Sequence, residues 1–221
     1  TIALPASQVL QVGTDRAGNV LGLHPALSGL KQIFDGGKLA IIQRTGYVNS
    51  SRSHFQGFDI YGTANPGNPQ GTGWLGRYLD TLPSPVSPLV AWDALREVPR
   101  ALTSEHVSVP AIPSAAAYTY ASPNTGTAAT LERTYALRIA SHVPIDRPHL
   151  AFVNGNIDAA MNSLDKVALV TRYVPSLTYP TSGLGQTMKT VAGAMAAGVG
   201  TKVFWVQLGG FDTHATQVGT N

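Results

Sequence analysis

The sequence predicts an α/β fold in which helices flank a mostly parallel central sheet. Short apolar runs bounded by glycine or proline, typical of buried strands, occur at residues 39–46, 87–92 and 201–210. Between these runs lie longer segments in which apolar residues recur at helical spacing. Alternating strands and helices favour a parallel sheet, because each helix returns the chain to the end of the sheet where the next strand begins.

The first predicted helix and strand form one half of such a unit. Pro25 suits a first helical turn, and apolar side chains follow it at helical spacing over residues 25–34. These side chains are Leu27, Leu30, Ile33 and Phe34. Gly36 and Gly37 are expected to end the helix, so that the run 39–46 enters the sheet as a buried strand.

A second helix, a loop, a third helix and a strand are expected next. The helix covers residues 51–62, and its large apolar side chains are expected to pack inward. They are Phe55, Phe58, Ile60 and Tyr61. Residues 63–73 are rich in Asn, Pro and Gly and therefore predict a loop. A short helix over 74–82 ends at Pro83, and the strand over 87–92 follows.

The remainder is expected to complete a single domain over residues 1–221, with a loop-rich insertion or cap at about 99–180. Residues 99–124 are rich in Pro, Ser and Ala, which favours irregular structure. Helices are then expected over 127–142, 157–174 and 183–198. In the first of these, Leu131, Tyr135, Leu137 and Ile139 are expected to face inward. The last strand, 201–210, is expected to be central and buried on both faces.

Composition narrows the possible functions. Only 12% of the 221 residues are charged and the net charge is +3, with no run of Lys or Arg, so nucleic-acid binding is not favoured. The chain has no cysteine, which excludes disulfides, zinc–thiolate sites and a Cys nucleophile. The apolar segment 191–200 is too short and too rich in glycine to span a bilayer, so no transmembrane segment is expected.

A glycine pattern at residues 71–76, "GTGWLG", matches the dinucleotide fingerprint G-x-G-x-x-G. That fingerprint binds pyrophosphate only when it follows a strand directly and opens a helix. Here an Asn-Pro-Gly-Asn-Pro loop precedes it, and the expected acidic residue at the end of a second strand is missing. A nucleotide-binding module is therefore disfavoured.

The end of the chain carries the first candidate site, "GGFDTH". Ligands of open α/β sheets bind beyond the carboxyl ends of the strands, which is where this segment follows the last predicted strand. Asp212 and His214 alternate, so an extended backbone would point both side chains to one side. A carboxylate and an imidazole are ordinary ligands of zinc and other divalent metals, although a site needs further ligands. The alternative is a helix-capping Asp and a locally bonded His.

The second candidate site is "SRSH", residues 51–54, between a predicted strand and a predicted helix. A Ser51 or Ser53 hydroxyl at a helix N-terminus lies where the dipole and unpaired N–H groups favour a bound anion. Such a hydroxyl can be a nucleophile for phosphoryl or sulfuryl transfer when a metal activates it, and Arg52 could pair with the anionic ester. The alternative is a serine that only caps the helix. No G-x-S-x-G pentapeptide is present for a Ser-His-Asp hydrolase.

Four segments together resemble a bacterial family, the domain of unknown function 1501 family. They are "LGLHPALSGL", "LAIIQRTGY" with "SRSHF", "GTGWLGRYL" and "QLGGFDTHATQ". Members are grouped with the alkaline phosphatase and sulfatase superfamily, and many are exported by the twin-arginine route. The resemblance therefore implies a sulfatase-like α/β fold and a periplasmic or secreted location in bacteria.

The resemblance also implies site roles. Ser51 or Ser53 occupies the position of the superfamily nucleophile, with His54 beside it, and Asp212 and His214 fall where metal ligands are expected. The metal would be divalent, with zinc preferred and manganese or calcium as alternatives. Similar proteins bring further ligands from Gly-Gly-x-Asp-Gly, Ser-Glu-Phe-Gly-Arg and Asp-His-Gly segments, which this sequence lacks. The fold is accordingly expected to be incomplete at both ends, as in an internal fragment of a longer member.

Two functions are therefore expected. The first is metal-dependent hydrolysis of phosphate or sulfate esters, with a small anionic ester as substrate and part of the site outside these residues. The alternative is a non-catalytic exported or cell-surface protein that keeps the sulfatase-like fold for binding or assembly. The sequence leaves the substrate and the oligomeric state open.

Overall fold

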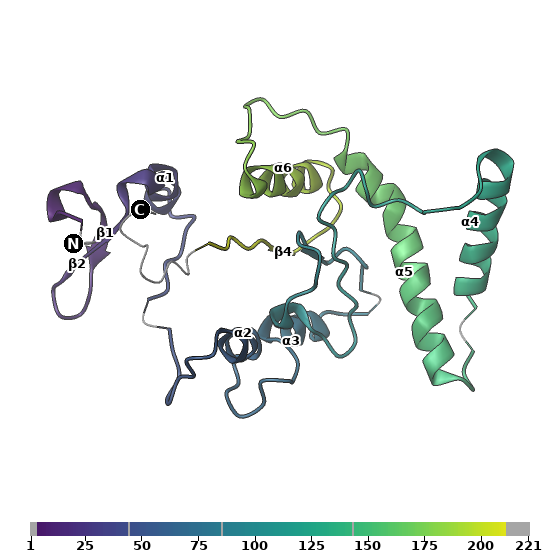
Figure 1. The fold of residues 1–221 in the computed structure, drawn as a ribbon, viewed down its shortest axis with the longest axis horizontal. Coiled ribbons are helices and arrows are strands. Elements are labelled where there is room, and N and C mark those ends of the chain that lie inside the picture. Colours follow the sequence, from purple (N-terminus) through teal and green to yellow (C-terminus); the bar gives the residue numbers. More distant parts are fainter. Residues whose placement is uncertain (1–3, 44, 85, 143, 211–221) are drawn as a thin grey trace. The chain divides into compact units, whose positions relative to one another are not determined.

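The computed structural model describes residues 4–43, 45–84, 86–142 and 144–210 (Figure 1). The chain divides into two compact units, Thr1–Asn49 with Gly209–Asn221, and Ser50–Leu208. Each unit is described by itself below. This division reflects only how compactly the parts of the chain pack. It does not test the single domain with an insertion over 99–180, which stays a prediction.

The described part of the first unit holds a β-hairpin and a helix. After a 3-10 turn, Ala6–Gln8, strands β1 (Leu10–Thr14) and β2 (Val20–Leu23) pair antiparallel. The sequence did not predict this hairpin. Its turn is held by the Asp15 carboxylate, which accepts the backbone N–H groups of Ala17 and Asn19 at 2.8 and 2.9 Å. The adjoining Gly18 has a φ of +80°, which glycine adopts without strain.

The helix predicted over 25–34 is confirmed. A 3-10 turn, Pro25–Leu27, leads into α1 (Ser28–Asp35), and Gly36 caps its end. Lys31 and Asp35 form an ion pair one turn apart on its surface.

The strand predicted over 39–46 is wrong for the residues that are described. Leu39–Gln43 form neither helix nor strand, and the Ile42 side chain is 84% exposed. A strand exists only where another backbone accepts and donates its ladder hydrogen bonds. In the described part of the chain, β1 and β2 pair only with each other, so neither strand is a partner for residues 39–43.

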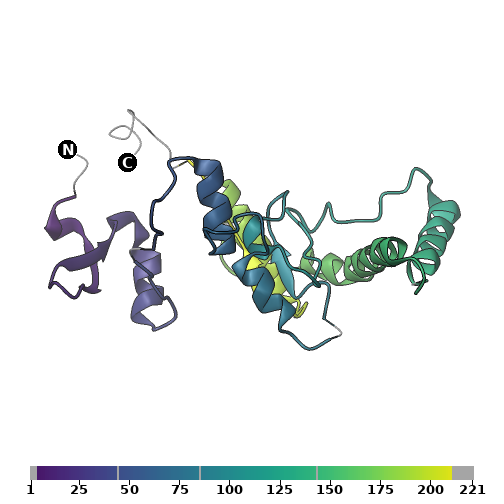
Figure 2. The same cartoon turned by 90° about the horizontal axis from the view of Figure 1, so that it is seen from below.

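The second unit is mainly helical (Figure 2). Its helices are α2 (His54–Thr63), α3 (Trp74–Asp80), α4 (Gly126–Ala140), α5 (Pro148–Val170) and α6 (Gly183–Ala196), with a 3-10 turn, η3, at Arg100–Leu102. All five helices were predicted, and α5 begins nine residues before the predicted start at residue 157, at Pro148, which suits a first helical turn.

The strands of this unit are β3 (Ala91–Asp93) and β4 (Val203–Trp205), which pair in parallel. A parallel bridge joins Asp93 to Ala111 on the other side of β3. The mixed α/β class is thus confirmed. The larger parallel central sheet and its sulfatase-like arrangement stay predictions, because the described strands form two sheets of two strands each.

Two apolar clusters cover the two faces of β3. Trp92 belongs to a cluster with residues of α5 and α6, whereas Ala91 belongs to one with Leu79 of α3 and Leu102 of η3. This is the alternation expected of a strand covered on both sides. In contrast, β4 is only half buried, so the prediction of a last strand buried on both faces is wrong for Val203–Trp205.

Several apolar side chains predicted to face inward are exposed. On α2 only Ile60 of the predicted set is buried; on α4 three of the four are exposed. The exposed residues are Phe55, Phe58, Tyr61, Leu131, Tyr135 and Ile139. Helical spacing identifies an apolar face, but only a neighbouring element can cover it.

Candidate functional site

The residues predicted to carry the chemistry, Ser51 to His54, lie at the N-terminus of α2. Ser53 is the N-cap, and its Oγ accepts the backbone N–H of Gln56 at 3.4 Å. The Ser51 Oγ accepts the backbone N–H of Ser53 at 3.0 Å. Both serine oxygens therefore serve local backbone structure, as the capping alternative requires.

The same position has the electrostatics that an anion site requires. Ser53 and His54 are exposed and Ser51 is half buried, so small solutes can reach the start of the helix. The first turn of α2 contains no acidic residue that would compete with an anion for its N–H groups. Arg52 adds a positive charge at the adjoining position. A phosphate or sulfate group is the class of ligand that the sequence predicts for this position, and its binding stays a prediction.

The other two predicted site residues, Asp212 and His214, lie outside the described residues. Within the described ranges, no three His, Asp or Glu side chains gather closely enough to hold a metal ion. The metal site at residues 212–214 therefore stays a prediction.

The glycines of the "GTGWLG" segment have a packing role. A Cβ on Gly73 would overlap the carbonyl oxygens of Arg100 and Ala101, and a Cβ on Gly76 would overlap the carbonyl of Thr103. The Gly73 N–H also donates to the Thr103 carbonyl at 2.8 Å. A turn and an irregular segment, with no strand, precede Gly71. This close approach of α3 to residues 100–104 explains the glycines without a bound nucleotide.

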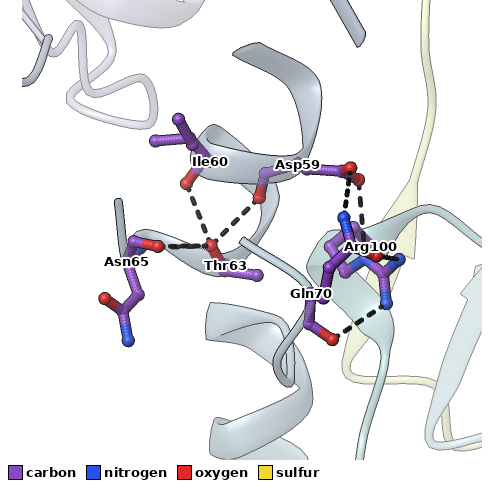
Figure 3. Close-up of polar contacts among 6 residues, drawn as sticks. All are labelled: Asp59, Ile60, Thr63, Asn65, Gln70 and Arg100. Atoms are coloured by element: carbon purple, nitrogen blue, oxygen red, sulfur yellow. Dashed lines mark hydrogen bonds and ion pairs between the residues drawn. The ribbon is translucent and has the colours of Figure 1, made fainter. Parts of the chain in front are cut away.

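The loop between α2 and α3 is fastened by polar side chains (Figure 3). Gln70 donates to the Asp59 carboxylate at 2.9 Å, and Arg100 donates to the Gln70 side-chain oxygen at 3.0 Å and pairs with Asp59 at 3.5 Å. The Thr63 hydroxyl donates to the Asp59 carbonyl at 3.0 Å. Arg77 donates to the Thr63 carbonyl at 2.9 Å. These charged groups satisfy one another, so the network holds the loop in place.

An open groove of about 910 Å³ lies beside the C-terminal end of α3. The Asp80 carboxylate in its lining accepts three hydrogen bonds. They come from the Ser104 hydroxyl at 2.5 Å and from the backbone N–H groups of Glu105 and His106 at 3.0 and 2.9 Å. Burial raises the pKa of Asp80, but these hydrogen bonds outweigh burial and hold the pKa below its ordinary value. Asp80 therefore serves to fix residues 104–107.

Comparisons with protein families, with curated proteins and with solved structures found no match. The family resemblance thus rests on the sequence segments that carry it.

One polar pair in the core was missed by sequence reasoning. Asp93 ends β3 with 0% of its surface exposed, and neither carboxylate oxygen has a hydrogen-bond partner among the described residues. The indole N–H of Trp205, the residue opposite on β4, is also buried without a partner in the described chain. The only sequence signal was an Asp directly after the apolar run "PLVAW".

Burial raises the pKa of the Asp93 carboxyl to about 6, from an ordinary value of 3.8. The backbone N–H of Leu95 offsets part of the rise, although it lies outside hydrogen-bonding geometry. The pKa values of Asp93 and Asp80 are thus shifted in opposite directions. The Asp93 carboxyl is buried without a partner, whereas the Asp80 carboxylate accepts hydrogen bonds from three donors.

None of the described helices combines the length and the apolar character that crossing a membrane needs.

Proposed function

We propose that this chain carries part of a metal-dependent hydrolase that acts on phosphate or sulfate esters. The observation that carries the proposal is the position of Ser51 to His54 at the start of α2, where two hydroxyls and Arg52 adjoin the positive end of a helix. The family resemblance supports it, since the superfamily uses a nucleophile at this place. The substrate would be a small anionic ester, and the location would be the bacterial periplasm or outside the cell.

In this proposal the chain's residues have distinct roles. The N–H groups of α2 and the Arg52 guanidinium bind the ester oxygens, and the hydroxyl of Ser51 or Ser53 attacks in line. Asp212 and His214 are ligands of the metal, with zinc preferred over manganese and calcium, and a complete site needs further ligands. When bound, the metal would lower the pKa of the attacking hydroxyl.

Replacing the metal ligand is expected to remove both metal and activity. Asp212→Ala is expected to weaken metal binding by more than about the hundredfold that outer-shell changes can cost. Metal content after dialysis and turnover of aryl phosphate and aryl sulfate are the measurements. A wild-type protein without bound zinc, manganese or calcium, and with the same turnover as the variant, would contradict the proposal.

The roles of Ser51 and Ser53 can be distinguished with a substitution that keeps the N-cap of α2. Glycine is nearly as good an N-cap as serine, so Ser53→Gly is expected to cost only a few tenths of a kcal/mol, whereas Ser53→Ala costs about 1 kcal/mol. If Ser53 is the nucleophile, both variants lose turnover although only Ser53→Ala loses stability. If Ser51 is the nucleophile, Ser51→Ala alone loses turnover. Thermal unfolding and turnover measured on all three variants make the assignment.

A non-catalytic exported binding protein is the second candidate. It is favoured by the engagement of both serine oxygens with backbone N–H groups, which a purely structural helix start explains. Under this alternative, Ser51→Ala and Ser53→Gly leave every assayed property except stability unchanged.

A further inference from the structure

Asp93 and Trp205 lie side by side at the carboxyl end of the parallel pair β3–β4. They are register partners, and the backbone N–H of Ala94 donates to the Trp205 carbonyl at 3.1 Å just beyond them. Partners on neighbouring strands extend their side chains to the same face of the sheet. Side chains alternate along a strand, so this is the face of Ala91, which packs against Leu79 and Leu102, and not that of Trp92.

The side chain of Asp93 is therefore on the face of β3 that carries an apolar cluster, and it is fully buried. A buried carboxylate without a charged or hydrogen-bonding partner is costly, and such a group adopts its neutral form instead. The adjoining indole N–H of Trp205 is buried without a partner among the described residues as well. Two such groups therefore lie at one register position of the β3–β4 pair, where buried polar groups are ordinarily hydrogen-bonded.

The charged side chains on elements that pack against β3 are engaged elsewhere, exposed or half buried. On the Ala91 face, Arg77 donates to the Thr72 and Thr63 carbonyls, Asp80 accepts three donors, and Arg100 pairs with Gln70 and Asp59. Glu105 and His106 next to them, Arg96 and Glu97 after β3, and Lys202 before β4 are exposed. On the Trp92 face, α5 and α6 carry Asp158, Asp165, Lys166 and Lys189, and Arg172 follows α5. None of these charges contributes to the shift of the Asp93 pKa.

We infer that Asp93 is a proton-controlled switch in the core, whose neutral carboxyl permits β3 and β4 to close and whose ionisation opens the pair at Trp205. The proton leaves to solvent as the strands separate. This device is independent of the proposed hydrolase activity, because it requires neither Ser51 to His54 nor a metal.

The direction of the pH effect follows from the raised pKa. Between pH 3.8 and about 6 the folded state retains a proton that the unfolded or opened state releases. The stability that the neutral carboxyl provides is complete below pH 3.8 and is lost as the pH rises through about 6. Opening of β3–β4 is consequently favoured toward neutral and alkaline pH.

Hydrogen exchange at the amide of Ala94 tests the switch, because this N–H bridges β3 to β4. After correction for intrinsic exchange rates, protection at Ala94 is expected to fall about tenfold from pH 5 to pH 7.5. This factor follows from a pKa of 3.8 for Asp93 in the opened state and about 6 in the closed state. Asp93→Asn is expected to remove this fall. Asp80→Asn is the matched control, since its pKa is shifted the other way, and it should leave the fall in place. Equal pH dependence in the wild type and Asp93→Asn would overturn the inference.

A second measurement needs no variant. Carbon NMR of the Asp93 carboxyl in the wild-type protein is expected to show a titration midpoint near 6, with the Trp205 indole signal changing over the same range. A midpoint at or below 4 would overturn the inference, because it would mean that the charged form is accommodated.

Discussion

Gly76→Ala is expected to lower the free energy of unfolding by about 3 kcal/mol, at the upper end of the cost of overpacking a core. A Cβ at this position would overlap the carbonyl group of Thr103 and approach the backbone nitrogen of Ser104 at 2.9 Å. Both contacts are backbone, so no side chain can rotate to relieve them. Either α3 or residues 103–104 must move, which also disturbs the hydrogen bonds that Asp80 accepts from Ser104 and its neighbours. Urea denaturation followed by circular dichroism measures the change.

Gly57→Ala is the matched control for this prediction. Gly57 lies within α2, and a Cβ there would meet no atom within 4 Å. The substitution is therefore expected to raise stability by roughly 0.5–1 kcal/mol, the intrinsic helical advantage of alanine over glycine. If both variants unfold at the same urea concentration, the close approach of α3 to residue 103 is contradicted.

Those two glycines also show which parts of the fold the sequence could predict. Helix ends are specified locally: Pro25 lies in a first turn, Ser53 caps α2, and Gly36 follows α1. Pro148 carries the same kind of signal, although the predicted start of α5 at residue 157 missed it. Each signal acts within a few residues, so it can be recognised without knowing the tertiary structure. The close approach at Gly76 depends on residues 27 positions further along the chain, which no local pattern specifies.

Strands were predicted less well because each one depends on a partner. The apolar run 39–46 had the composition of a strand, yet Leu39–Gln43 pair with nothing described. The hairpin β1–β2 was missed although its turn carries a local signal, the Asp15 side chain followed by Gly18. Apolar spacing likewise identified the face of α2 that carries Phe55 and Phe58 without showing whether another element covers it.

The candidate site also combines features that a local pattern specifies with features that depend on tertiary structure. The position of Ser51 to His54 at a helix start could be predicted, because a cap is a local feature. The choice between nucleophile and cap could not, since it depends on what lies across from the hydroxyls. Asp93 was missed because an Asp after an apolar run is ordinarily solvated at a strand end, and its burial depends on tertiary packing that no local pattern specifies.

Trp92→Ala is expected to have an effect as large as that of Gly76→Ala, with a loss of about 3–5 kcal/mol. The Trp92 side chain is 1% exposed and lies in the cluster that joins β3 to α5 and α6, against Val167, Val170 and Ala194. Its ring also packs against Phe204 of β4 at a centroid distance of 6.1 Å. A cavity of this size among helices and strands cannot close without moving several elements. Since a domain of ordinary stability has only about 5–15 kcal/mol to lose, the variant is expected to be close to unfolding at 37 °C.

Two milder variants test the hydrogen bond of the Trp92 indole. The Trp92 indole N–H donates to the Ile112 carbonyl at 3.0 Å, which attaches residues 110–112 to β3. Trp92→Phe keeps an aromatic ring but removes this donor, so the loss should include roughly 1–3 kcal/mol for a buried carbonyl left without it. Trp74→Phe makes the same exchange on α3, where the side chain is 48% exposed, and should change stability by no more than about 0.5 kcal/mol. Equal urea midpoints for the two Phe variants would mean that Trp92 does not hold this core together. A larger loss of stability for Trp92→Phe than for Trp74→Phe would show that the hydrogen bond to Ile112 contributes to this core.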